Sequence, residues 1–148
     1  MTDAEMTIER ATEASDEVVA ALRRLIPQLS ETADLPTHAG LADMVARPDT
    51  HLLVARDGDG AIVGSLTLVL YRIPTRLEGV IQDVVVDAAA RGRGIGEALT
   101  REAQRIGKEE GVGQIRLSSR PEREAANRLY PRLGFERRET NVYVWRPG

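Results

Sequence analysis

The sequence contains no cysteine and only two histidines, His38 and His51. The lack of cysteine excludes disulfides, thiolate metal sites and a cysteine nucleophile. Two histidines are too few for a histidine-rich metal site, so no metal is expected. The formal net charge of -3 gives no reason to expect nucleic acid as a partner.

Long hydrophobic runs are also missing. Apolar runs such as residues 52–55 and 84–86 fall far short of the ~20 residues that a bilayer span requires. Residues 1–17 are acidic and have no apolar core segment, so no signal peptide is predicted. We therefore expect a cytoplasmic protein without a membrane partner. A length of 148 residues is typical of a single domain, so one domain is expected over residues 1–148.

The hydrophobic pattern alternates between the strand period and the helix period. An apolar stripe behind a Ser15 N-cap predicts an amphipathic helix over Asp16–Leu29. Further helices are expected at 39–46, 97–110 and 121–130. Strands are expected at 7–11, 50–56, 61–70, 79–86, 114–118, 135–140 and 141–145, with a hairpin turn at 57–60 and a loop at 72–76. This order predicts an α/β fold, with a mixed sheet and helices on its faces.

One segment places a buried strand, a glycine-rich turn and a helix in direct succession. Backbone amides at such a helix start lack intrahelical partners and lie at the positive end of the helix dipole, which favours a pyrophosphate. Gly92, Gly94 and Gly96 leave no β-carbon in the way of a close approach. Arg91 and Arg93 add positive charge.

A glycine-rich turn alone also fits a tight strand-to-helix connection without a ligand. The Walker pattern fails, because no Lys-Ser or Lys-Thr follows the glycines. The Rossmann fingerprint fails as well, because the turn lies late in the chain and no acidic-ended strand follows about 20 residues on.

The run Arg91-Gly92-Arg93-Gly94-Ile95-Gly96 resembles the acetyl-coenzyme A signature of the GNAT N-acetyltransferase superfamily, Q/R-x-x-G-x-G/A. The preceding Val84-Val85-Val86-Asp87 resembles the strand before that signature, and Tyr130-Pro131-Arg132-Leu133-Gly134-Phe135 resembles the family's Tyr-x-x-Leu-Gly-Phe. Together with the element order and the length, the resemblance covers essentially the whole chain. It implies a mostly antiparallel sheet, splayed open at a cofactor cleft between the strands at 79–86 and 114–118.

The resemblance implies acetyl-CoA as co-substrate and direct attack of an amine on the thioester. Backbone groups of Val84, Val85 and Val86 are expected to pair with the pantetheine arm. Amides from Gly92 to Glu97, that of Ile95 included, are expected to take the pyrophosphate. The implied activity is N-acetylation of a primary amine on a small molecule. A protein lysine or N-terminal acetyltransferase, and an acetyl-CoA-binding module with weak catalysis, stay open as alternatives. The resemblance also implies a homodimer, with residues 142–145 as a candidate contact.

Tyr130 matches the family's acid for the leaving thiolate. A phenol of pKa ~10 can protonate a thiolate whose conjugate acid has a pKa near ~8.5. The alternative is an aromatic ring that packs its helix onto the sheet. Pro131 disfavours helical geometry at the preceding residue, so the helix is expected to end or kink at Tyr130.

The general base is less clearly marked. Relatives read Ile-Glu-Asp where this chain has Ile81-Gln82-Asp83. Gln82 cannot titrate, but it can hold a water that relays the proton. Asp83 is expected on the opposite face of the strand, where it orients a substrate or supports a loop. Glu78 and His38 are outside candidates.

On the last helix, Arg123, Asn127 and Tyr130 follow i, i+4, i+7 spacing and are expected on one face. Arg123 stands where relatives often have the asparagine that meets the cofactor, so Arg123 and Asn127 are candidate cofactor contacts. A surface arginine near Glu124 is the alternative for Arg123. By resemblance, residues 30–39 and 71–76 recognise the acceptor, and their mixed charges do not name it.

Overall fold

The structure, a computed structural model, describes residues 5–148. The chain forms two compact units, one extending to Ser118 and the other from Ser119 to Gly148. Within the described residues, no helix is both long and apolar enough to cross a membrane.

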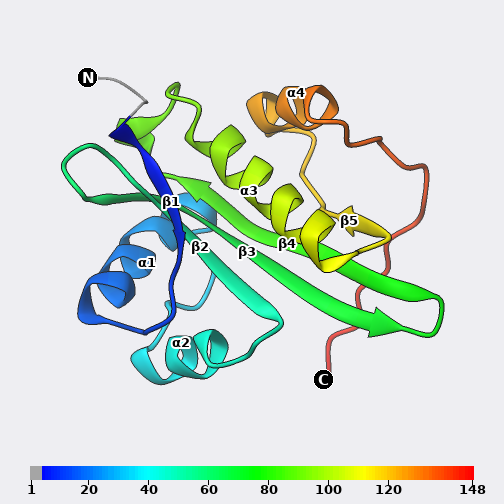
Figure 1. Ribbon diagram of the computed structural model, residues 1–148, viewed down its shortest axis with the longest axis horizontal. Helices are drawn as coiled ribbons and strands as arrows, with labels where there is room; N and C mark the ends of the chain where they lie inside the picture. The colour runs from blue at the N-terminus through cyan, green and yellow to red at the C-terminus, as the bar shows by residue number, and fades with distance from the viewer. Residues whose placement is uncertain (1–4) are drawn as a thin grey trace. The chain divides into compact units, whose positions relative to one another are not determined.

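A five-stranded sheet is the centre of the first unit (Figure 1). Its strands follow one another across the sheet in chain order: β1 (Thr7–Arg10), β2 (Thr50–Arg56), β3 (Ile62–Ile73), β4 (Arg76–Val86) and β5 (Gln114–Arg116). The first four pair antiparallel, and β5 pairs parallel to β4. The prediction of a mixed, mostly antiparallel sheet is therefore confirmed.

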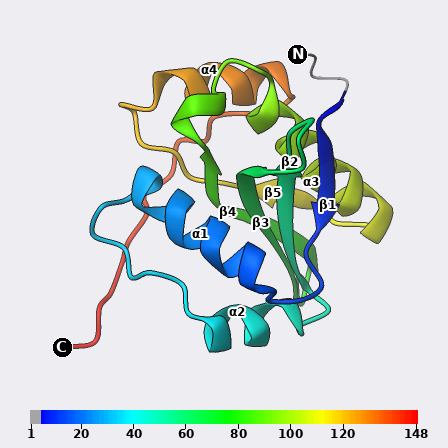
Figure 2. The same ribbon diagram turned by 90° about the vertical axis from the view of Figure 1, so that its left-hand side faces the viewer.

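Helices cover both faces of this sheet (Figures 1 and 2). On one face lie α1 (Asp16–Leu29) and α2 (His38–Val45), and on the other lies α3 (Ile95–Glu110). The core under α1 and α2 includes Leu25, Leu52 and Val85. A short 3₁₀ turn, η2 (Ala88–Ala90), connects β4 to the loop before α3.

The first helix has the bounds that the sequence predicts. Ser15 accepts a hydrogen bond from the Val18 amide at 3.2 Å, as an N-cap should. Pro27 does not end the helix, because the Ser30 amide still bonds the Ile26 carbonyl at 3.0 Å. The apolar stripe of α1 is buried against the sheet.

The loop expected at residues 72–76 is wrong. Strand β3 continues to Ile73, and β4 begins at Arg76 directly opposite it, so only Pro74 and Thr75 form the turn. The antiparallel register runs unbroken from Thr67 opposite Gln82 to this turn. The Tyr71 hydroxyl also donates across it to Glu78 Oε2, at 2.9 Å.

The second unit contains α4 (Glu124–Arg132) and no strand within its described residues. The closing strands expected at 135–140 and 141–145 are therefore wrong. Strand-type alternation forms a ladder only when a partner strand is available, and a lone two-stranded hairpin is marginal in water. The helix also continues through Pro131 to Arg132, so the expected end at Tyr130 is wrong.

Candidate active site

Strands β4 and β5 separate shortly after they meet. Their parallel pairing covers only three positions and ends where Val80 lies opposite Arg116. Strand β4 continues from Ile81 to Val86, bonded to β3 along its other edge. Backbone groups on the β5 side of this stretch, which includes Val84 and Val86, therefore form no ladder within the described residues. The expected opening of the sheet is confirmed.

The open edge of β4 leads into the glycine-rich loop. Gly92 and Gly94 have φ of 82° and 77°, a left-handed conformation that side chains rarely adopt. A β-carbon added to either glycine would meet no atom within 4 Å. The loop surface is therefore open at both positions, and this leaves room for a ligand to approach the backbone.

Helix α3 begins with amides that have no acceptor within the helix. The first intrahelical bond runs from the Ala98 amide to the Gly94 carbonyl, at 3.0 Å, so the amides of Ile95 and Gly96 have no acceptor in the helix. Arg91 is exposed and donates its Nε to the Val86 carbonyl at 3.3 Å. Arg93 is exposed in the same loop. Helix dipole and guanidinium groups together favour an anion.

A β-bulge interrupts β4 at Asp83. Ser65 lies opposite Val85 and Thr67 lies opposite Gln82, so two residues of β4, Asp83 and Val84, oppose a single residue of β3. Asp83 has a φ of 51°, the one positive φ outside glycine in the described residues. A bulge redirects side chains relative to plain alternation, so the alternation rule behind the expected opposite placement of Gln82 and Asp83 does not apply across it.

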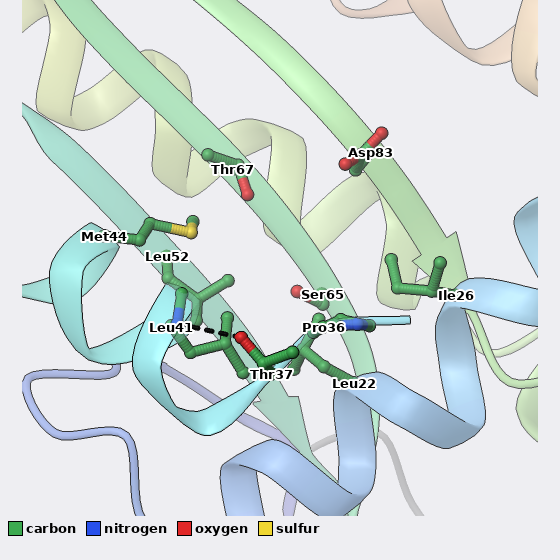
Figure 3. A pocket seen from close by; sticks show the side chains of 11 residues that line it. Leu22, Ile26, Pro36, Thr37, Leu41, Met44, Leu52, Ser65, Thr67 and Asp83 are labelled. Atoms are coloured by element: carbon green, nitrogen blue, oxygen red, sulfur yellow. Dashed lines mark hydrogen bonds between the residues drawn. The ribbon is translucent and has the colours of Figure 1, made fainter. Parts of the chain in front are cut away.

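Asp83 lines a pocket between the helices and the sheet (Figure 3). The pocket measures about 220 Å³. It is lined from α1, from the α1–α2 loop, from α2, and from strands β2, β3 and β4, by Leu22, Ile26, Pro36, Thr37, Gly40, Leu41, Met44, Leu52, Ser65, Thr67 and Asp83. The α1–α2 loop was expected to recognise the acceptor. The contribution of Ser65 and Thr67 was not expected, because no sequence motif marks them.

Of the candidate bases, Glu78 is already engaged. Its carboxylate accepts hydrogen bonds from Tyr71, from Gln114 and, at 3.2 Å, from Arg76. The Tyr71 hydroxyl in particular holds the pKa of Glu78 below its ordinary value, and this weakens the carboxylate as a base. His38 is exposed at the start of α2, and Gln82 is exposed on β4.

In the second unit, the Tyr130–Phe135 motif forms a helix cap. The Phe135 amide bonds the Tyr130 carbonyl at 3.0 Å, and the Gly134 amide bonds the Pro131 carbonyl at 3.1 Å. Gly134 has a φ of 93°. This is the Schellman arrangement, and its usual hydrophobic contact is here an edge-to-face pair of the Tyr130 and Phe135 rings, 5.7 Å between centroids.

The polar groups of the last helix lie at its start and within it. Arg123 is the N-cap residue of α4, with non-helical backbone angles, and Asn127 and Tyr130 lie within the helix. The Asn127 Nδ2 donates to the carbonyls of Arg120 and Arg123, at 2.8 and 3.0 Å, and thereby fixes the helix start. Burial raises the pKa of the Tyr130 hydroxyl, and the charge of Arg123 partly offsets this.

Comparison with known proteins identifies the family. The model of the Acetyltransferase (GNAT) family matches residues 16–135. "Probable glucosamine 6-phosphate N-acetyltransferase 2" of Oryza sativa subsp. japonica is 35% identical over 131 residues, 82% of this chain and 77% of that protein. An acetyltransferase structure from Trypanosoma brucei has a TM-score of 0.77 at 30% identity and covers 94% of this chain and 98% of its own. A mycothiol acetyltransferase of Beutenbergia cavernae is 38% identical over 88 residues, 60% of this chain but 29% of that protein. With its splayed sheet and its glycine-rich loop before α3, the chain belongs to the GNAT family of acetyltransferases.

Proposed function

We propose that this protein transfers the acetyl group of acetyl-CoA to the primary amine of a small molecule. The amine nitrogen forms a bond to the thioester carbon, and the carbon–sulfur bond breaks. An acceptor that enters as an ammonium ion gives one proton to solvent and one to the leaving thiolate. No acyl-enzyme is needed, which agrees with the absence of cysteine.

The observation that carries this proposal is the continuity of the open β4 edge with the glycine-rich loop. Unpaired backbone along β4 suits an amide-containing arm, which can add to a strand edge as another strand would. The space beside Gly92 and Gly94, with the Ile95 and Gly96 amides behind it, suits a pyrophosphate. We assign Val84, Val85 and Val86 to the pantetheine arm, and Arg91, Arg93 and Glu97 to the loop that holds the phosphates.

The catalytic assignments rest on the motif match and on local chemistry. The Tyr130 phenol, whose pKa burial raises further, is protonated at neutral pH, as an acid for the thiolate must be. Asp83 and Gln82 are assigned to the acceptor side, Asp83 as a direct contact and Gln82 through a water. Arg123 and Asn127 stay candidate cofactor contacts, although the Asn127 amide nitrogen already has two carbonyl acceptors.

A small acceptor is favoured over a protein by two observations. The relatives named above carry small-molecule acceptors in their names, a glucosamine phosphate and mycothiol. The pocket beside Asp83 measures about 220 Å³ and lies between two helices and the sheet. That volume is below the ~300–1,000 Å³ of typical ligand sites and suits a compact amine.

We also propose that both units form one acetyltransferase domain, because the family match at 16–135 crosses the boundary at Ser118. A cytoplasmic location and a homodimer are proposed with it. Support for the homodimer is the exposed apolar run Val142, Tyr143, Val144 and Trp145.

The proposal is tested by thermal unfolding with increasing acetyl-CoA. At about 100 times its dissociation constant, the ligand should add ~2.7 kcal/mol to the wild-type free energy of unfolding. Gly94→Glu should lose this response, because it places bulk and negative charge where the pyrophosphate is expected. Gly60→Glu is the matched control, since Gly60 has a similar φ of 85° and equally open surroundings in the β2–β3 turn.

Stabilisation of the wild type and of Gly60→Glu, but not of Gly94→Glu, supports the assignment of the loop. Equal stabilisation of all three proteins would mean that acetyl-CoA binds elsewhere. No stabilisation of any of them would overturn the proposed function.

A further inference from the structure

The pocket beside Asp83 is apolar over most of its lining. Six of its eleven residues are large and apolar: Leu22, Ile26, Pro36, Leu41, Met44 and Leu52. Figure 3 shows them on α1, α2, the loop between these helices and β2. Such a surface stabilises an apolar body by excluding water from it, at about 25 cal/mol per Å² buried.

Polar groups lie on the strand side of the same pocket. Ser65 and Thr67 are on β3, and Asp83 is on β4 beside them (Figure 3). The Thr37 hydroxyl, on the helix side, is already used, because it accepts the Gly40 amide at 3.0 Å and caps α2. A ligand would therefore place its polar end toward the sheet and its apolar body toward the helices.

Asp83 carries the single charge among the eleven lining residues, which include no arginine, lysine or histidine. Two arginines of α1 lie close in sequence to this lining, but neither is among the eleven residues that form it. Arg23 donates to the Pro36 carbonyl at 2.7 Å. Arg24 donates to the Ile62 carbonyl at 2.6 Å and lies 3.6 Å from the Asp87 carboxylate.

The bulge gives Asp83 its position. A non-glycine residue at positive φ is uncommon, and aspartate is among the few types that tolerate it. Such conformations persist where the surrounding structure enforces them, and they gather at functional sites. Here the pairings on both sides, Ser65 with Val85 and Thr67 with Gln82, hold the bulge in place.

We propose that the acceptor is a small, unphosphorylated primary amine with an apolar body, and that Asp83 binds its ammonium group. This inference rests on the proposed function and names the class of its acceptor. A carboxylate is the natural partner of an ammonium ion. A phosphate monoester would bring negative charge into a lining whose one charge is already negative, with no arginine or lysine to receive it.

The acceptor class therefore differs from the glucosamine 6-phosphate in the name of the rice relative. That substrate carries a phosphate and a hydroxylated ring, whereas this lining offers mainly carbon. The chain can keep the family's transfer chemistry at β4 and α3 while α1 and α2 select another amine.

The test measures release of free CoA with 2-phenylethylamine, glucosamine and glucosamine 6-phosphate as acceptors. A thiol-reactive dye reports the CoA without background, because the chain has no cysteine. We expect kcat/KM to be greatest for 2-phenylethylamine, by about tenfold or more over glucosamine 6-phosphate. Each amine is also tested for its effect on the Tm of the CoA-bound protein, which reports binding without turnover.

Variants separate charge recognition from folding. Asp83→Asn keeps the size and the tolerance of positive φ, and it should raise KM for 2-phenylethylamine roughly ten- to hundredfold, the usual weight of a charged hydrogen bond. The Tm increase with acetyl-CoA should stay unchanged. Asp59→Asn, in the exposed β2–β3 turn, removes the same charge away from the pocket and should leave KM unchanged. Met44→Arg adds a cation to the lining and should raise the rate with glucosamine 6-phosphate.

Two results would overturn the acceptor assignment while leaving the proposed function intact. One is a preference of the wild type for glucosamine 6-phosphate. The other is failure of 2-phenylethylamine both to be acetylated and to raise Tm, in a protein that acetyl-CoA still stabilises. Absence of any acetyl-CoA response would instead be a failure of the proposed function itself.

Discussion

His51 is buried in β2, and its Nδ1 has no hydrogen-bond partner within the described residues. Burial lowers the pKa of its imidazole below the ordinary value of 6.5, and the charge of Arg10 lowers it further. Glu110 and Asp49 act in the opposite direction without reversing the shift. The folded protein therefore holds this histidine neutral at a pH where the unfolded chain would protonate it.

This histidine predicts acid sensitivity of folding. The free energy of unfolding is not reduced by this histidine above the unfolded-state pKa near 6.5. As the pH falls below that value, the free energy of unfolding decreases by at most ~1.4 kcal/mol per pH unit. We expect the wild-type Tm to fall more steeply between pH 7.5 and 5.5 than that of His51→Leu. The difference between the two proteins at pH 7.5 gives the packing effect alone, and carboxylate titration is common to both. Parallel Tm curves would contradict the prediction.

Tyr130 has a role in packing and a proposed role in catalysis, and a single substitution separates them. Tyr130→Phe keeps the ring that packs edge-to-face on Phe135, so Tm should change little. Loss of the proton donor should lower kcat roughly 10²–10⁴-fold, the usual weight of general acid catalysis, with the acetyl-CoA affinity nearly unchanged. Steady-state kinetics and the acetyl-CoA Tm titration measure the two quantities.

Tyr143→Phe is the control for this substitution, because it removes the same hydroxyl at a tyrosine outside the proposed active site. Its kcat should equal that of the wild type. A normal kcat in Tyr130→Phe would remove Tyr130 as the acid and leave the cap as its explanation.

At the scale of elements, the end of α4 depends on Gly134. Its φ of 93° and its amide bond to the Pro131 carbonyl complete the cap that also holds Phe135. A left-handed conformation costs other residues roughly 1–2 kcal/mol. We expect Gly134→Ala to speed hydrogen exchange in the last turn of α4 by about fivefold or more. Gly60→Ala is the control, because it introduces similar strain in a turn of the first unit and should leave hydrogen exchange in α4 unchanged. Equal exchange rates in α4 of both variants would contradict the prediction.

Elements whose determinants are local were predictable from the sequence. Helix α1 has its cap, its acidic first turn and its apolar stripe within one segment, and its bounds match the prediction. The glycine-rich loop was predictable for the same reason, because positive φ at Gly92 and Gly94 is a property of glycine itself. Features that depend on pairing with another strand were not predictable from the sequence. Asp83 lies in a bulge that exists only through the register of β4 on β3, and plain alternation cannot indicate it.

The pocket beside Asp83 shows the same dependence on distant residues. Its lining combines residues of α1 and α2 with Ser65 and Thr67, which lie on β3. Single hydroxyl residues on a strand have no motif, so only the folded sheet brings them to Asp83. The likeness to the family therefore pointed to residues of the glycine-rich loop, and the fold was needed to describe the pocket beside Asp83.

At the scale of the whole molecule, one exposed apolar run bears on how many chains assemble. An apolar run is formed by Val142, Tyr143, Val144 and Trp145, which are 67–87% exposed. Soluble monomers rarely expose large contiguous apolar patches. Tyr143 and Trp145 together offer roughly 300–500 Å² of apolar surface. A standard interface takes ~800 Å² from each partner, so this run can supply about half of one.

We therefore expect a homodimer in which this run is covered by a second chain. Light scattering after size-exclusion chromatography should give twice the chain mass of 16.2 kDa for the wild type. Val144→Asp should return the mass to that of one chain, because an unpaired carboxylate is costly to bury. Leu35→Asp is the control, since Leu35 is 43% exposed in the α1–α2 loop and should not affect the dimer. A wild-type mass of 16.2 kDa at every concentration would show that the run is not a dimer contact, and a dimer that survives Val144→Asp would locate the interface on another surface.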